Sequence, residues 1–212
     1  MLTEWTYCDT ADWLGGAAQS WNVLSNAGFF LLAALVWRQP SARSNRFGLV
    51  AIGIASSLWH ATAASWALLI DISAILTWTA LFIYDVRRFY TFSLPLAYGA
   101  WLVFIAVSAI SGFLLVDVLP LLSGAFVPYV LLLVLAPYLL PLSVHERASC
   151  WLGSVALSIG IIAREVDSTL CAFVPIGTHI LWHLSAAVVT AVPIVVLYRR
   201  AQGRLRPAHV IV

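Results

Sequence analysis

The stretch PIGTHILWHLSAAVVTAVPIVVLY, Pro175–Tyr198, is mostly apolar and carries two histidines, His179 and His183, near its start. About 20 predominantly apolar residues suffice for a helix to cross the hydrocarbon core of a bilayer. Ionisable side chains are costly in that environment, so each one indicates a specific role. Residues four apart lie on the same face of a helix, and the two histidines therefore project together. The stretch predicts a membrane helix that contributes to a polar site.

The composition of the whole chain extends this prediction. Hydrophobic residues make up 62% of the 212 residues, charged residues make up only 9%, and the mean hydropathy is +0.96. Soluble domains typically contain about 25% charged residues. The apolar segments are Trp21–Trp37, Phe47–Ser65, Trp66–Tyr84, Pro95–Val116, Leu121–Leu142, Ser149–Ile162 and Pro175–Tyr198. We therefore expect an all-α membrane protein, with residues 1–212 forming a single seven-transmembrane helix bundle.

The basic residues predict the orientation of this bundle, because they concentrate on the cytoplasmic side of membrane proteins. The chain has eleven arginines and no lysine, and with seven spans only Arg164 falls on the outer side. The tail of about residues 199–212 is then cytoplasmic, and the short segment 1–20 lies outside. We expect Arg164 to form a salt-bridged outer loop with Glu165 and Asp167, with contact to a lipid head group as the alternative.

The same arginines indicate where the protein resides. They account for the net charge of +2 and favour anionic lipid head groups, rather than nucleic acid, as neighbours. We expect a multi-pass integral membrane protein, in the plasma (inner) membrane of a bacterium or in an ER/Golgi-type membrane of a eukaryote. The sequence predicts no particular oligomeric state.

Four ionisable residues lie in the outer halves of the predicted spans: His60, Asp71, His179 and His183. With a rise of about 1.5 Å per residue, their depths below the outer ends are roughly 6 to 12 Å. Three histidines at one level are the ligand set of a catalytic zinc site, whose fourth position holds water. The alternative is that each histidine forms an interhelical hydrogen bond. That role suits one isolated histidine better than three beside an aspartate.

A zinc site of this kind predicts roles for its neighbours. Zinc lowers the pKa of bound water to about 7 and polarises a carbonyl group. Asp71 is then a candidate general base, or the group that orients the water. Ser56, four residues before His60, shares its helix face and can hydrogen-bond the water or a developing oxyanion. The candidates for lining a substrate pocket are Trp59, Trp182, Asn22 and Asn26, with core packing and interhelical hydrogen bonds as the alternatives.

Short motifs along the chain resemble the alkaline ceramidases, in their order and in their spacing. This family belongs to a superfamily of seven-span hydrolases that also includes adiponectin receptors and lipid-remodelling proteins. The motifs are YCD at Tyr7–Asp9, SWNVLSN at Ser20–Asn26, SSLWHAT at Ser56–Thr62, Asp167 with Cys171, and HILWH at His179–His183. The resemblance extends from residue 7 to residue 183 and covers most of the chain.

The resemblance implies an intramembrane zinc amidase. It assigns the zinc ligands to His60, His179 and His183, and it places Ser56 and Asp71 beside the zinc water. The implied reaction is hydrolysis of the amide in a ceramide-like membrane lipid to a sphingoid base and a fatty acid. Two alternatives are a hydrolase of another lipid amide or ester, and a non-enzymatic receptor or sensor with structural zinc. An open zinc position favours chemistry over a structural site.

The outer N-terminal segment departs from the family. Eukaryotic alkaline ceramidases have a calcium site there, built from several acidic residues. Asp9 matches one of these acids, whereas Thr6 and Gln19 stand where acids are expected. Calcium prefers several carboxylates or carbonyls. Although Glu4, Asp9 and Asp12 offer some ligands for Ca²⁺, we expect a solvated acidic tail instead.

The three cysteines divide between the two sides of the predicted bundle. Cys8 precedes the first span and Cys171 precedes the seventh, so both lie outside, where disulfides are permitted. Cys150 lies at the cytoplasmic end of the sixth span and is expected to stay free. We predict a Cys8–Cys171 disulfide that ties the N-terminal segment over the site, and the matching cysteines of the family support this pairing.

Overall fold

The protein is all-helical, as predicted. The computed structural model describes residues 7–9, 19–37, 43–90, 93–120, 122–140 and 142–205. Helices make up 82% of the structure, and no residue in those ranges lies in a β-strand. The helices are α1 (Ser20–Ser25), α2 (Ala27–Leu35), α3 (Arg43–Thr62), α4 (Ser65–Tyr90), α5 (Leu94–Leu114), the 3₁₀ helix η2 (Ser123–Phe126), α6 (Val127–Leu139), α7 (Val144–Glu165), α8 (Asp167–Leu170) and α9 (His179–Leu205).

Each of the predicted apolar segments coincides with helix, with some differences at the ends. The first segment is divided at Asn26 into α1 and α2, and the fifth begins with η2 before α6. The helix at the sixth segment, α7, is longer than the predicted Ser149–Ile162, because a capping box starts it at Val144. Glu146 N–H donates to Ser143 Oγ at 3.4 Å, and Ser143 N–H donates to Glu146 Oε2 at 2.7 Å. The capping pair supplies acceptors at the helix start and so places it before Ser149.

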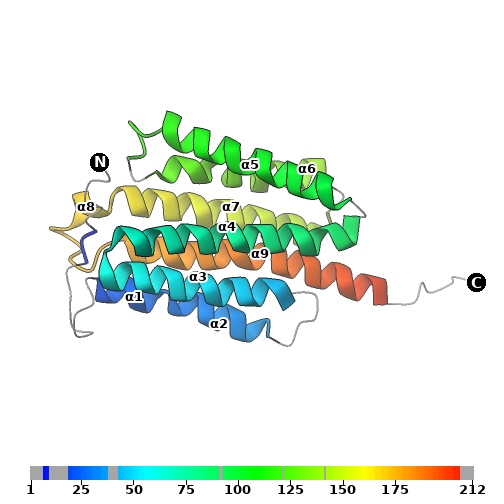
Figure 1. Ribbon diagram of the computed structural model, residues 1–212, viewed down its shortest axis with the longest axis horizontal. Helices are drawn as coiled ribbons and strands as arrows, with labels where there is room; N and C mark the ends of the chain where they lie inside the picture. Colours follow the sequence, from blue (N-terminus) through cyan, green and yellow to red (C-terminus); the bar gives the residue numbers. More distant parts are fainter. Residues whose placement is uncertain are drawn as a thin grey trace, which may run out of the picture.

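The helices run side by side along the long axis of the molecule (Figure 1). Helix α9 contacts α1, α2, α4 and α7, while α5 and α6 lie on the far side of α7. The N-terminal segment, α8 and the start of α9 lie at one end of the bundle, and α9 leads towards the C-terminus at the other. Helix α9 therefore packs against helices from both the first and the second half of the sequence.

Small residues bring α7 close to α9. A Cβ atom at Gly160 would lie 2.8 Å from Ser185 Cβ, and one at Gly153 would lie 2.8 Å from Val192 Cγ2. Such short approaches are typical of helix pairs packed through glycine and serine. The close packing holds the first part of α9, which carries His179 and His183, against the end of α7.

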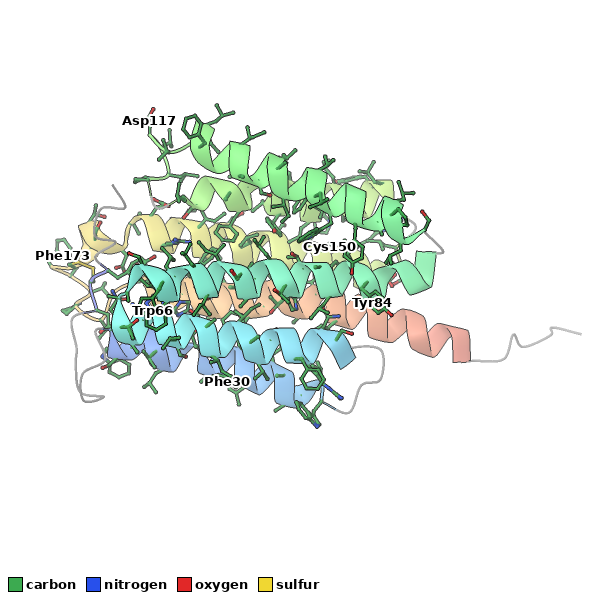
Figure 2. All side chains as sticks on the ribbon, in the orientation of Figure 1. Phe30, Trp66, Tyr84, Asp117, Cys150 and Phe173 are labelled. Atoms are coloured by element: carbon green, nitrogen blue, oxygen red, sulfur yellow. A yellow bond between two sulfur atoms is a disulfide. The ribbon has the colours of Figure 1, made fainter. Side chains whose placement is uncertain are left out.

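Two helical segments, Ser65–Tyr84 and Leu94–Leu114, are long and apolar enough to cross a membrane. Large apolar side chains also project from the outside of the bundle, among them Phe30, Trp66 and Phe173 (Figure 2). The other described helices are shorter or more polar. The prediction of seven spans therefore goes beyond what helix length and composition show.

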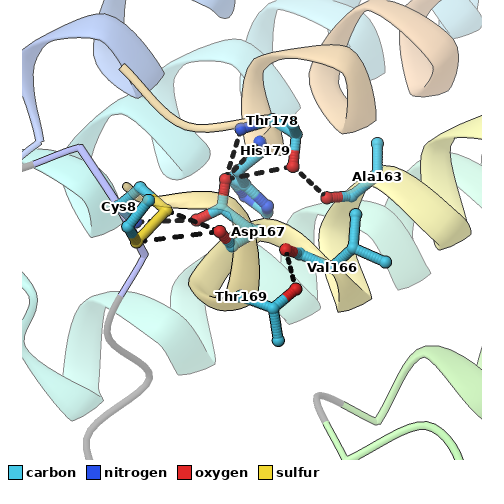
Figure 3. The surroundings of a disulfide bond; sticks show 8 residues. Cys8, Ala163, Val166, Asp167, Thr169, Thr178 and His179 are labelled. Atoms are coloured by element: carbon cyan, nitrogen blue, oxygen red, sulfur yellow. Dashed lines mark hydrogen bonds between the residues drawn. A yellow bond between two sulfur atoms is a disulfide. The ribbon is translucent and has the colours of Figure 1, made fainter. Parts of the chain in front are cut away.

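A disulfide joins the N-terminal segment to the loop before α9. The Cys8 and Cys171 sulfurs are 2.10 Å apart and the Cα atoms are 5.1 Å apart, which confirms the predicted pairing (Figure 3). Cys150 is buried and free, also as predicted. Residues separated by 163 positions in the sequence are thus covalently linked at one end of the bundle.

The Asp167 carboxylate organises the same region. It is fully buried, and Oδ1 accepts hydrogen bonds from the backbone N–H of Thr178 and, at 2.8 Å, of His179. Oδ2 accepts from the backbone N–H of Cys8 at 2.7 Å (Figure 3). First-turn amides of a helix lack partners within it, so a buried carboxylate is an effective cap. Asp167 therefore caps α9 through backbone amides, a role that the prediction of a salt-bridged loop did not include.

Gly177 is required by this arrangement, and its replacement is a test of it. Its φ angle is +78°, and a Cβ atom there would lie 2.6 Å from Asp167 Oδ1. We expect Gly177→Ala to lower the free energy of unfolding by about 1–3 kcal/mol, measured by thermal unfolding in detergent. Gly99→Ala is the control, because nothing lies within 4 Å of its added Cβ. Alanine in that helix should be neutral or stabilise by up to about 1 kcal/mol. A Gly177→Ala protein as stable as Gly99→Ala would contradict the capping geometry.

Candidate metal site

Three histidines from two helices form a compact cluster. His60 lies near the end of α3, and His179 and His183 occupy the first turns of α9. One nitrogen of each ring lies within 4.8 Å of the other two, and all three side chains are buried. The predicted convergence of these residues is confirmed, and the cluster can hold a metal ion.

Hydrogen bonds to the outer ring nitrogens orient two of the histidines. His60 Nδ1 lies 2.6 Å from Gln19 Oε1, an atom that only accepts, so Nδ1 carries the proton. His183 Nδ1 lies 2.5 Å from Ser25 Oγ, whose own hydrogen is donated to Asn22 O at 2.8 Å. Ser25 therefore accepts from His183 Nδ1–H. Both rings are left with an unprotonated Nε2, which is the form that binds a metal.

A different observation supports His179 as a metal ligand. Its Nδ1 is buried, and none of the described residues hydrogen-bonds to it. A buried polar atom without a partner is costly, and binding of a metal ion through this nitrogen would supply the missing partner. The ring of Tyr7 stacks on His179 with a centroid separation of 3.6 Å and an interplanar angle of 21°. The third imidazole is thus held by packing rather than by a hydrogen bond to its ring.

Tyr7 forms a wall of the site at the end of the bundle. The Cys8–Cys171 disulfide fixes the neighbouring residue, so the predicted placement of the N-terminal segment over the site is confirmed. Burial raises the pKa of the Tyr7 hydroxyl, while the nearby Arg164, to which it hydrogen-bonds, acts in the opposite direction. Tyr7 therefore presents a neutral phenol at physiological pH.

A cavity of about 280 Å³ adjoins the cluster. The three histidines, Asp71, Trp59 and Trp182 lie on its wall, together with apolar residues of α4 and α5. A second cavity of about 80 Å³ is lined by Ser56, Asp71 and His183, among others. Asp71 Oδ1 is buried, and it accepts no hydrogen bond from the described residues. Asp71 therefore lies on the wall of both cavities, with one buried oxygen that has no hydrogen-bond partner among the described residues.

Asn22 and Asn26, candidates for lining the pocket or for interhelical hydrogen bonds, line neither of these two cavities. Both are fully buried, and their side-chain amides donate hydrogen bonds to neighbouring residues of the same segment. Asn22 Nδ2 donates to Gln19 Oε1 at 3.2 Å, and Asn26 Nδ2 donates to Asn22 O at 3.0 Å. Asn22 thereby holds the glutamine that orients His60, a role that spacing along one helix does not reveal.

Asp9 is also placed differently from the prediction of a solvated tail. It is only 1% exposed, and its Oδ2 accepts from the backbone N–H of Asn22 at 2.9 Å. The start of α1 needs such an acceptor, which explains why the carboxylate is buried. Gln19, where an acid was expected, contacts His60 instead. The remaining residues of the calcium hypothesis, Glu4, Thr6 and Asp12, lie outside the described residues.

Arg164 was predicted to lie in a salt-bridged outer loop, with contact to a lipid head group as the alternative, rather than in the wall of a cavity. It lies in the last turn of α7, is 7% exposed, and lines the larger cavity with the histidines. Its Cζ atom lies 5.1 Å from the centre of the Trp182 ring. The sequence contained one signal for it, since Arg164 is the one arginine that the orientation rule places on the outer side.

Comparison of the chain with protein-family models, with curated proteins and with solved structures finds no match in any of the three. The resemblance to alkaline ceramidases therefore rests on the short sequence motifs alone.

Loss of any one ligand should empty the site. We expect His60→Ala, His179→Ala and His183→Ala each to reduce the metal that copurifies with the protein to about one tenth or less, because two imidazoles bind weakly. Elemental mass spectrometry of the purified chain measures this. His145→Ala is the matched control, since His145 is exposed in the first turn of α7. Equal metal content in the control and the cluster variants would refute the site.

The orienting hydrogen bonds should contribute to affinity without being essential. We expect Ser25→Ala to weaken Zn²⁺ binding by about 10–100-fold, because His183 loses the acceptor that fixes its tautomer. Competition with a chelator of known affinity measures the change. Ser73→Ala is the control, because Ser73 is exposed on α4 and donates only to Leu69 O at 2.7 Å. Unchanged affinity in Ser25→Ala would show that this bond does not orient a ligand.

Proposed function

We propose that this chain is an intramembrane zinc-dependent amidase that hydrolyses ceramide-like lipids to a sphingoid base and a fatty acid. One observation carries the proposal: a three-histidine cluster and Asp71 line one cavity whose remaining wall is largely apolar. A lipid amide has a polar scissile bond and long apolar chains. The histidines and Asp71 suit the polar bond, and the apolar wall suits the chains. The motif resemblance to alkaline ceramidases points to the same reaction.

The donor set supports zinc as the metal. Imidazole nitrogens suit zinc among the common biological metals. Among the described residues, no fourth histidine, cysteine or carboxylate joins the cluster. A structural zinc site is normally closed by four protein ligands, whereas a catalytic site keeps one position open. The three-ligand set therefore favours an enzyme over a receptor or sensor with structural zinc.

A seven-span membrane topology accompanies this proposal. Helix α5 exposes a series of large apolar side chains to its surroundings: Leu94, Leu96, Leu102, Val103, Val107, Ile110, Phe113 and Leu114. Soluble monomers rarely expose contiguous apolar patches of more than a few hundred Å². The arginine distribution supports a cytoplasmic C-terminus, with the histidine cluster in the outer half of the bilayer.

The chain's own residues divide the reaction between them. Zinc, when bound, supplies a Lewis acid and acidifies a water molecule. Asp71 accepts a proton from the attacking water and delivers it to the amide nitrogen as the C–N bond breaks. Ser56 donates a hydrogen bond to the carbonyl oxygen, where negative charge develops. Trp59 and Trp182 form apolar walls that exclude bulk water from the reacting bond.

Replacing the proposed base, unlike replacing a metal ligand, should leave the metal in place, and this difference tests the assigned roles. We expect Asp71→Asn to keep its metal and to lower the turnover of a ceramide by about 10²–10⁴-fold, because an amide cannot shuttle the proton. Ser56→Ala should also keep its metal, and its turnover should fall less than that of Asp71→Asn. Asp117→Asn is the control, because Asp117 is exposed in the loop after α5 (Figure 2). Activity is measured as release of sphingoid base from ceramide in detergent micelles.

Three results would overturn parts of the proposal. An Asp71→Asn protein with wild-type turnover would exclude Asp71 as the base. Cleavage of lipid esters but not amides would assign a different hydrolase. A metal-loaded wild-type protein that cleaves neither would support the receptor or sensor alternative.

A further inference from the structure

Ser108 of α5 places a buried hydroxyl in the wall of the larger cavity. The residue is 6% exposed and lines that cavity together with the three histidines and Asp71. Its Oγ atom forms no hydrogen bond with any of the described residues. A hydroxyl buried without a partner is costly, so a ligand group that hydrogen-bonds to it gains binding free energy.

Several other hydroxyls inside the helices are satisfied locally. Ser73 and Thr77 each donate to the carbonyl four residues earlier at 2.7 Å, and Ser158 does so at 2.9 Å. Ser154 donates to the carbonyl three residues earlier at 2.9 Å. Such back-bonding to the same helix is a common arrangement for serine and threonine. Because Ser108 does not use it, its hydroxyl is available to a group in the cavity.

Ser108 lies at the same depth in the bundle as Asp71. The consecutive helices α4 and α5 run in opposite directions (Figure 1), and Trp101 Nε1 donates to Thr79 Oγ1 at 2.9 Å between them. Asp71 precedes Thr79 by eight positions, and Ser108 follows Trp101 by seven. With a rise of about 1.5 Å per residue, both lie roughly 10–12 Å from that hydrogen bond along the bundle. Ser108 is therefore level with the amide on which Asp71 is proposed to act.

The wall around Ser108 is otherwise apolar. The described residues that α5, the following loop and η2 contribute to the cavity are Ile105, Ser108, Ala109, Leu122, Ala125 and Phe126. An apolar wall suits the acyl half of a ceramide better than the amine half, which carries two hydroxyls close to the nitrogen. A single serine in this wall then suits an acyl chain that carries one hydroxyl.

We propose that Ser108 is a specificity determinant that binds a hydroxyl on the first carbons of the acyl chain. A serine hydroxyl both donates and accepts, so it can pair with another hydroxyl in either direction. Only carbons close to the carbonyl group reach the depth of Ser108. The inference rests on the proposed amidase function and narrows its substrates: ceramide-like lipids with a 2- or 3-hydroxyacyl chain are preferred over those with a plain chain of the same length.

A matched set of substrates tests it. N-palmitoylsphinganine, N-(2-hydroxypalmitoyl)sphinganine and N-(3-hydroxypalmitoyl)sphinganine share the base, the amide and the chain length. We expect wild-type kcat/KM to be about 5–50-fold higher for at least one hydroxyacyl lipid than for the plain one, mainly through a lower KM. Ser108→Ala should bring that ratio to about 1, because alanine keeps the helix and removes only the hydroxyl.

The control is Ser154→Ala, a replacement of another buried helical serine. Ser154 is 4% exposed, its hydroxyl is used by its own helix, and it lines neither cavity. This variant should keep the wild-type ratio. A wild type with no preference at either position would overturn the inference. A preference that survives in Ser108→Ala would also overturn it, and would assign recognition to chelation of the metal by the acyl hydroxyl and the carbonyl oxygen.

A second pair of lipids examines the amine half. N-palmitoyloctadecylamine lacks both hydroxyls of N-palmitoylsphinganine, and we expect Ser108→Ala to leave the ratio of kcat/KM between these two lipids as it is in the wild type. A change in that ratio without a change in the hydroxyacyl ratio would assign Ser108 to the amine half and overturn the inference.

Direct binding separates this inference from the amidase proposal. If the wild type hydrolyses none of these lipids, calorimetry with the zinc-loaded protein in micelles still compares their affinities. Tighter binding of a hydroxyacyl lipid that is lost in Ser108→Ala supports recognition of the acyl hydroxyl without hydrolysis. Equal affinities for the plain and hydroxyacyl lipids overturn it.

Discussion

The buried carboxylate of Asp167 is the interaction on which the site depends. One of its oxygens accepts from the amides of Thr178 and His179, and the other accepts from the amide of Cys8. Negative charge at this position also complements the positive end of the α9 helix dipole. A single side chain thereby fixes the first turn of the helix that carries two histidines and anchors the segment that places Tyr7 on one of them.

The parts of the molecule that local rules govern could be predicted from the sequence. Apolar runs of helical length predicted the helices, and the spacing of His179 and His183 predicted that both lie on one helix face. The short turn between α3 and α4 then made His60 a neighbour of Asp71. These inferences need only the rise of a helix and the length of a connection, so they survive errors of a few residues at helix ends.

The polar residues around the histidines could not be predicted in the same way. Gln19 and Ser25 reach His60 and His183 across 41 and 158 positions of sequence, and those contacts depend on how α1 packs against α3 and α9. The burial of Asp9 could not be predicted, because an acidic residue near a terminus usually faces water, whereas here its carboxylate caps the start of α1. The early start of α7 was signalled by Ser143 and Glu146, but an apolar run alone does not include its cap.

The disulfide has a consequence for the order in which the site is assembled. It closes a loop between Cys8 and Cys171, and two of the three histidines lie beyond that loop, at positions 179 and 183. A chain emerging from the ribosome therefore cannot form the disulfide until Cys171 is made, and it lacks two of the three histidines until the seventh apolar segment follows. An incomplete chain carries one histidine of the cluster and cannot form the three-histidine site, so this site is among the last features that synthesis completes.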